Sequence, residues 1–145
     1  MTLLKKRKFK VDKAFQPLSE DEGDEFYPNG IFVFNITKLM TFIKANPHIF
    51  QQEEVEVKTV RTFPSKNLND LTIQNANISE PIVMAEISPD RFNVIDGNHR
   101  LERAYRDGEN TIPAYKIKAE QHVAFLTSVA AYKDYIEYWN SKIGK

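Results

Sequence analysis

Within residues 80–118, segments with the hydrophobic pattern of β-strands are interrupted by a segment with the pattern of an α-helix. This order of elements constrains the fold more than any other feature of the sequence. Apolar runs at 80–88, 92–96 and 112–118 are typical of strands. Between the last two runs, "GNHRLERAYRDG" is typical of a helix that ends at Gly108, a residue able to adopt the left-handed conformation of a C-terminal cap. The "PDR" between the first two runs predicts a hairpin turn. Two antiparallel strands, a helix and another strand predict a mixed sheet covered by a helix.

The rest of the chain adds elements of the same kinds. "IFVFN" at 31–35 predicts a short buried strand, and the following helix should begin after Asn35, a good N-cap residue, and end before Pro47. Valines alternate with charged residues at 53–63, which predicts an exposed strand. One long helix is expected at 120–144. The predicted fold class is therefore α/β or α+β, with a small mixed sheet flanked by helices.

With 145 residues the chain has the size of a single domain. Residues 1–29 are basic and then acidic, which predicts a partly ordered arm that ends in a turn at 27–30. The domain proper should span 30–145. It contains an irregular insert at 64–79, rich in Asn and Ser, for which we expect a long loop with a turn of helix. The insert is a candidate cover for a pocket.

Composition limits the function classes. Twenty Lys and Arg balance twenty Asp and Glu, so any anion binding must be local. The chain has no cysteine and only three histidines, which lie far apart in the sequence, so a metal site made by the protein alone is not expected. Neither a secretory signal nor a membrane-spanning apolar run is visible, and we expect a soluble cytoplasmic protein that does not bind membranes.

The candidate site is the turn from the strand at 92–96 into the next helix. The first amides of a helix lack intrahelical partners and, with the helix dipole, attract anions. Gly97 allows an unusual backbone angle and close approach of a ligand, while Asn98 can cap the helix or donate its amide. Further donors come from the side chains of His99, Arg100 and Arg103. They lie near the N-terminal end of the helix, where the helix dipole disfavours positive charge. A bound phosphate would satisfy these cations and amides together.

An alternative interpretation needs no ligand. In this interpretation His99 packs against the sheet. The two arginines, Arg100 and Arg103, pair with carboxylates such as Glu102, Asp107 or Glu86. Spacing alone leaves both interpretations open, because one glycine before a helix is a weak motif.

Two features of the last predicted helix are interpreted as structural. The aromatic cluster of Tyr132, Tyr135, Tyr138 and Trp139 should pack in the core with its polar tips near the surface. No partner can be identified for His122.

The stretch "VIDGNHRLERAYRDGENTIPAYKI" resembles the signature of the ParB/sulfiredoxin-like superfamily. "DGNHR", Asp96 to Arg100, matches the "DGHHR" of ParB-like domains, and "TIPA" from Thr111 matches the strand downstream of it. Pro81 and Ile82 match the "PI" that opens an upstream strand. The resemblance covers about 80–117 and implies a ParB/sulfiredoxin-like domain that holds nucleotide phosphates.

A second, weaker resemblance places residues 33–43 on an early strand and helix of the superfamily. In sulfiredoxins a lysine and a serine there help to bind ATP phosphates, and Lys38 and Thr41 stand at those positions, whereas Ala45 replaces a further hydroxyl. Sulfiredoxin itself needs a cysteine where this chain has Asn98. The resemblance therefore implies phosphate binding without sulfinic acid reduction.

Two functional hypotheses follow from the resemblance and the residues. The first is an NTPase or small-molecule kinase that uses magnesium with ATP or CTP, its phosphates held at Gly97–Arg100 with help from Lys38. Asp96 would be a general base or a magnesium contact, or would only cap the helix.

The second hypothesis is a non-catalytic regulatory or nucleic-acid-binding module that uses the same pocket, with contacts from the basic arm. A nuclease is less well supported. The second substrate, the preferred base and the oligomeric state stay open.

Overall fold

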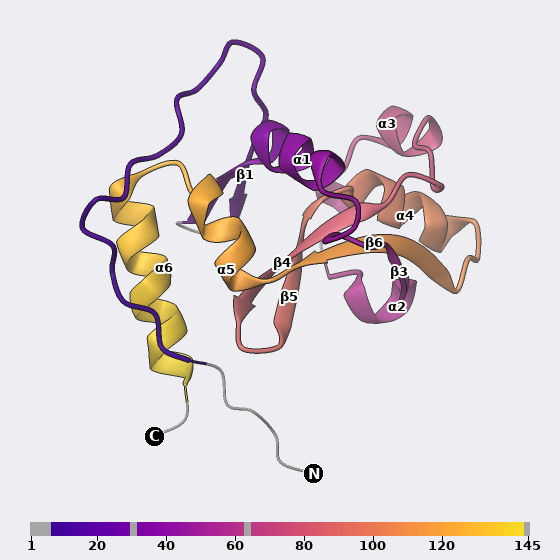
Figure 1. Ribbon diagram of the computed structural model, residues 1–145. Helices are drawn as coiled ribbons and strands as arrows, with labels where there is room; N and C mark the ends of the chain where they lie inside the picture. The colour runs from indigo at the N-terminus through magenta and orange to yellow at the C-terminus, as the bar shows by residue number, and fades with distance from the viewer. Residues whose placement is uncertain (1–6, 30–31, 63–64, 144–145) are drawn as a thin grey trace.

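The structure is a computed structural model that describes residues 7–29, 32–62 and 65–143 (Figure 1). Its strands are β1 (Phe26–Asn29), β2 (Phe32–Asn35), β3 (Glu53–Glu56), β4 (Ile82–Ser88), β5 (Arg91–Asp96) and β6 (Thr111–Ile117). Its helices are α1 (Ile36–Ala45), α2 (Val57–Val60), α3 (Asp70–Gln74), α4 (Asn98–Arg106), α5 (Ala119–His122) and α6 (Val129–Lys142), with short 3₁₀ turns η1 (Ser65–Asn67) and η2 (Val123–Phe125).

A four-stranded mixed sheet organises the fold, in the order β3-β6-β4-β5. Strands β4 and β6 are parallel, and the other neighbours are antiparallel. Strands β1 and β2 pair separately as an antiparallel two-stranded sheet. The predicted mixed sheet flanked by helices is confirmed, and the second small sheet adds to it.

Strand β4 is buried at all seven positions because both faces of the sheet are covered. Val83, Ala85 and Ile87 point into a core shared with α1 and α6. Ile82 and Met84 point to the opposite face, into a smaller core shared with α2 and α4. The alternation follows the two-residue period of a strand, and it places α4 on one face of the sheet and α6 on the other (Figure 1).

Several local predictions are confirmed. Helix α1 begins after Asn35, whose side chain accepts from the Lys38 amide at 3.1 Å, and it ends at Ala45, before Pro47. Helix α4 is followed by Gly108 with φ +76°, and the β4–β5 hairpin turns at residues 89–90. The insert contains η1 and α3, as expected of a loop with a turn of helix, while its first residue, Pro64, lies outside the described residues.

The strand predicted at 53–63 is wrong beyond Glu56, where α2 begins. Val57 is fully buried, and Val60, three residues later, packs on the same core cluster. That spacing belongs to a helix, and it outweighs the alternation of the valines. Phe63 lies outside the described residues.

The single helix predicted at 120–144 is also wrong, because the chain breaks it into α5, η2 and α6. Leu126 is extended, and Ser128 starts α6 by accepting from the Ala131 amide at 3.0 Å. The end of the prediction, Gly144, lies outside the described residues. His122 does have a partner, since its Nε2 lies 2.7 Å from the backbone oxygen of Glu86.

The aromatic residues of α6 pack as predicted. Tyr132, Tyr135 and Trp139 are buried, and Tyr138 is partly exposed. No helix in residues 7–29, 32–62 or 65–143 is long and apolar enough to cross a membrane.

The arm runs along α6 and then reaches α1 (Figure 1). The Asn140 amide bonds both backbone groups of Phe9, at 2.8 and 2.9 Å, and Phe15 stacks on Tyr132 with ring centroids 4.0 Å apart. Farther along, Asp21 pairs with a side chain of α1. The turn predicted at 27–30 is wrong for 27–29, which belong to β1, and Gly30 lies outside the described residues, as does Ile31 of the predicted strand.

Candidate functional site

The chain passes from β5 into α4 through a single residue, Gly97. Gly97 has φ +100° and is the N-cap of α4. A Cβ atom added there would lie 2.7 Å from Ile82 Cγ2 and 2.8 Å from an Arg100 Nη atom. Both the left-handed angle and this contact require glycine, and the contact brings the start of α4 against β4.

The first turn of α4 has no side-chain cap. Helices α1, α3 and α6 begin with Asn35, Asn69 and Ser128, each of which accepts from a first-turn amide. No side chain does so for α4 within the described part of the chain, and its first intrahelical bond runs from the Leu101 amide to Gly97 at 2.9 Å. The amides before Leu101 therefore remain available to an anion.

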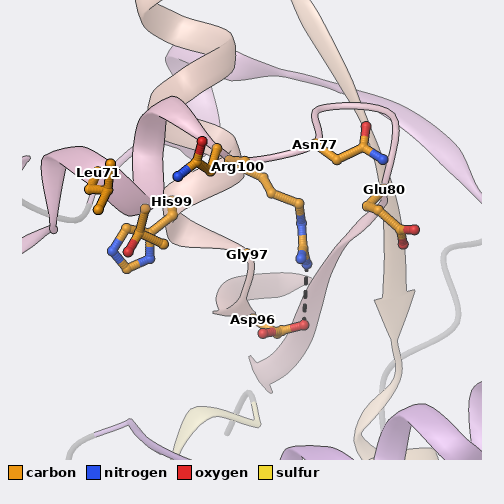
Figure 2. Close-up of a pocket in the computed structure, with 10 residues that line it drawn as sticks. Leu71, Asn77, Glu80, Asp96, Gly97, His99 and Arg100 are labelled. Carbon is orange, nitrogen blue, oxygen red and sulfur yellow. Dashed lines mark hydrogen bonds and ion pairs between the residues drawn. The ribbon is translucent and has the colours of Figure 1, made fainter.

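A cavity of about 510 Å³ opens at this turn (Figure 2). One wall is the end of β5 and the start of α4, and the other is α3 with the chain that follows it. The lining residues are Leu71, Thr72, Asn75, Ala76, Asn77, Glu80, Asp96, Gly97, His99 and Arg100. Four of the predicted site residues, Asp96, Gly97, His99 and Arg100, thus lie together.

Arg100 is held in place beside Gly97. Its Nη2 atom donates to the Asp96 carboxylate at 3.2 Å and to the Pro81 carbonyl at 3.1 Å, and Figure 2 shows the side chain extending to Asp96. The Nε atom of Arg100 is buried and has no hydrogen-bond partner among the described residues. Asp96 therefore pairs with Arg100 instead of capping α4.

His99 connects the two walls. The Asn69 amide, which precedes α3, donates to His99 Nε2 at 3.2 Å. The ligand-free interpretation placed this ring against the sheet, whereas in the structure it bonds the residue before α3 and lines the cavity.

Asn98 and Arg103 lie on α4, but they do not line the cavity. The Asn98 side-chain amide lies 3.5 Å from the Tyr27 hydroxyl of β1. Arg103 donates to Asp107 at 2.8 Å and also bonds the Gln74 carbonyl. For Arg103 the structure thus contains the ion pair of the ligand-free interpretation, and its role as a phosphate ligand stays a prediction.

Glu102 pairs with partners other than those expected. It is buried and binds Arg61 at 2.7 Å and Arg106 at 3.1 Å. The hydrogen bond from Arg61 lowers the pKa of Glu102, with a smaller effect from Arg106, although burial acts in the opposite direction. The network ties Arg61, the residue that follows α2, to α4.

Lys38 and Thr41 line a different cavity, of about 640 Å³, together with Asp21 and Asp24 of the arm. The ammonium pairs with both carboxylates, and the hydrogen bond to Asp21 is the main cause of its raised pKa. The pKa of Asp24 is lowered, first by a hydrogen bond from Asn35. The structure therefore does not bring Lys38 and Thr41 to the Gly97 cavity, and their phosphate contacts stay predictions.

The polar residues of the second wall were not among the predicted site residues. Thr72, Asn75, Asn77 and Glu80 come from the insert and its end. The one available signal was the Asn-rich composition of the insert. No group of three or more His, Asp or Glu residues that could hold a metal ion occurs among the residues whose positions are described.

Comparisons with known proteins place the chain in a family. The model of the ParB N-terminal domain matches residues 44–128, which include every cavity-lining residue but neither Lys38 nor Thr41. One solved structure that matches is the C-terminally truncated chromosome-partitioning protein ParB from Caulobacter crescentus complexed with CTP-gamma-S. It is 23% identical, with a TM-score of 0.33, and the match covers 59% of this chain and 51% of that chain, so this chain spans about half of its length. The chain matches no curated protein significantly. Because the family model covers more than half of the sequence, the chain belongs to the ParB N-terminal domain family.

Proposed function

We propose that this protein binds the phosphate groups of a nucleoside triphosphate in the cavity at the start of α4. The observation that carries the proposal is the uncapped first turn of α4, which opens beside Arg100. Free amides and a planar guanidinium are the donors that bind phosphate in proteins. The cavity volume of about 510 Å³ also suits a small ligand, since such sites measure roughly 300–1,000 Å³.

Magnesium is part of the proposal because carboxylates line the same cavity. Asp96 and Glu80 both line it, and either would repel a triphosphate directly. A magnesium ion bound mainly by the phosphates, with a direct or water-mediated contact to Asp96, would remove that repulsion. The ligand would then be the magnesium complex of ATP or CTP, the two nucleotides that the superfamily resemblance implies.

Whether the nucleotide is turned over depends on Asp96. In an NTPase or a small-molecule kinase this carboxylate would accept a proton from water or from a substrate hydroxyl. The alternative is a non-catalytic regulatory module, and the Asp96–Arg100 ion pair is the observation that favours it, because a paired carboxylate is not free to accept a proton.

Isothermal titration of the full chain with CTP and with ATP, each with and without magnesium, tests the binding. We expect saturable binding of one nucleotide per chain that strengthens with magnesium. Absence of binding for both nucleotides would refute the proposal.

A phosphate-release assay on wild type and Asp96→Asn then separates the two versions. Turnover that disappears in Asp96→Asn while nucleotide binding remains supports the enzyme. Binding without turnover in the wild type supports the regulatory module.

The nucleic-acid version of the module relies on the arm. Lys8 and Lys10 are exposed on either side of the docked Phe9 and are the candidate contacts to a nucleic acid. A gel shift at low salt that is lost in a Lys8→Glu, Lys10→Glu variant would support this version, and no shift at low salt would exclude it.

A further inference from the structure

We infer that His99 serves the anion site as an electrically neutral hydrogen-bond donor through Nδ1, in a tautomer selected by the backbone amide of Asn69. The inference deepens the proposed function and rests on it for the ligand. His99 lines the cavity and is bonded to Asn69 on the opposite wall.

The hydrogen bond between these residues defines the tautomer. A backbone N–H can only donate, and the Asn69 nitrogen lies 3.2 Å from His99 Nε2. Nε2 must therefore carry a lone pair, and in the neutral ring the hydrogen then resides on Nδ1.

The Nδ1–H group is available to a ligand. Within the described chain, no hydrogen bond is made by Nδ1 of His99, and this atom is not among the buried polar atoms that lack a partner. His99 lines the same cavity as Gly97. The charged groups that share the cavity with it are Asp96, Glu80 and Arg100. An anion at the start of α4 would thus meet the Nδ1–H donor together with the helix amides.

Helix α3 holds the Asn69 amide in position. The Asn69 side chain caps α3 by accepting from the Thr72 amide at 3.0 Å, and Ile73 anchors the helix in the interior. A second tie joins the same helices, from Arg106 of α4 to Asp70 at 3.3 Å. Asn69 is therefore a positioning residue, because it acts on the ligand only through His99.

The neutral form has a consequence for binding. A protonated imidazolium carries hydrogens on both nitrogens and could not accept from Asn69, so its formation would break the tie to α3. Donation from neutral Nδ1–H keeps that tie intact. An anion can then bind without displacement of α3.

The tautomer can be measured on the full chain without ligand by long-range ¹H–¹⁵N correlation spectroscopy of the histidine rings. The other two histidines of the protein serve as reference signals for this measurement. His122 Nε2 faces the Glu86 carbonyl at 2.7 Å and must carry hydrogen there, the opposite tautomer, while His48 is exposed. We expect His99 to show a protonated Nδ1 and a lone-pair Nε2. An Nε2–H tautomer, or an averaged pattern like that of a free side chain, overturns the inference.

Two substitutions at Asn69 test its positioning role. Asn69→Pro removes both the N–H group and the cap of α3, and the observed φ of −85° is close to the range of proline. Asn69→Ala keeps the N–H group and removes only the cap. With inorganic pyrophosphate as the probe, we expect Asn69→Pro to bind about two- to tenfold more weakly than Asn69→Ala, the effect of about one hydrogen bond. His99 should also lose its single tautomer in Asn69→Pro alone.

The outcomes separate this inference from the proposed function. If pyrophosphate and nucleotides bind the wild type but His99 has the wrong tautomer, or the two variants bind pyrophosphate equally, only the inference fails. If neither probe binds the wild type, the proposed function and the donor role fail together, and the tautomer result still decides whether Asn69 orients the ring.

Discussion

The guanidinium of Arg100 donates to the carboxylate of Asp96, four residues earlier in the chain, with Nη2 3.2 Å from Oδ2. The same Nη2 atom is held by the Pro81 carbonyl at 3.1 Å. Two oxygens from neighbouring segments thus hold the guanidinium of a residue that lines the cavity. Because the side chain is already ordered, a phosphate that binds there would pay little conformational entropy.

Replacing Arg100 should weaken anion binding selectively. We expect Arg100→Gln to lower the affinity for pyrophosphate about tenfold or more, because a charge-assisted hydrogen bond contributes about 1.5–3 kcal/mol. Arg91→Gln is the matched control, since it removes the same charge at the start of β5, outside the cavity. Isothermal titration of the three proteins measures the difference, and equal affinities for the two variants would show that Arg100 is not a ligand.

Two glycines with positive φ should respond differently to alanine. Gly97→Ala combines an unfavourable φ of +100° with contacts to Ile82 and Arg100 below 3 Å, and we expect it to destabilise the fold by ~2–4 kcal/mol. Gly108→Ala has φ +76° with open space around the added Cβ and should cost only about 1 kcal/mol. Urea denaturation of both variants gives the comparison, and a smaller loss for Gly97→Ala than for Gly108→Ala contradicts it.

The buried Glu102 should be needed for stability. Glu102→Gln removes the negative charge shared by Arg61 and Arg106, and we expect a loss of about 2–3 kcal/mol in the free energy of unfolding. Glu109→Gln, at an exposed position beyond α4, controls for the loss of one carboxylate. Because the pKa of Glu102 is lowered in the folded protein, its contribution exists above its unfolded pKa and disappears as the pH falls through the folded value. The two variants should therefore converge in stability at low pH.

His122 should make the fold sensitive to mild acid. Burial lowers the pKa of His122 from 6.5 to about 4, so the ring is neutral in the folded protein and charges more readily in the unfolded chain. Its contribution is complete above about pH 6.5 and is lost as the pH falls toward 4, by roughly 3 kcal/mol in total. Urea denaturation between pH 7 and 4 should show a flatter pH dependence for His122→Gln than for wild type, while His48→Gln should follow the wild type.

The docked arm should be visible through the only tryptophan of the chain. Trp139 is buried, its ring lies 5.2 Å from that of Phe9, and its Nε1 donates to the Arg7 carbonyl at 3.0 Å. Asn140→Ala removes both hydrogen bonds to Phe9 and should shift the tryptophan emission to longer wavelength as the arm loosens. Ser141→Ala, on the next residue of α6, should leave the emission unchanged. An unshifted spectrum in Asn140→Ala would show that these bonds do not hold the arm.

Local rules explain the predictions that succeeded. The cap at Asn35, the turn at Gly108 and the passage from β5 through Gly97 into α4 each depend on residues a few positions apart, so composition and spacing suffice to predict them. The predictions that failed have competing local signals. Valines at 55, 57 and 60 fit either a strand or a helix, and burial of Val57 and Val60 on one cluster decides for the helix.

By itself, the sequence determined a mixed α/β fold and the turn at Gly97 that leads from β5 into α4, because both follow from short-range periodicity and from glycine's lack of a side chain. Only the tertiary structure decided what faces that turn. Thr72, Asn75 and Asn77 reach the cavity because Ile73 anchors α3, and Lys38 is placed in another cavity by its pairing with the arm. Such contacts join residues far apart in the chain, and they depend on how whole elements pack rather than on the pattern of any one segment.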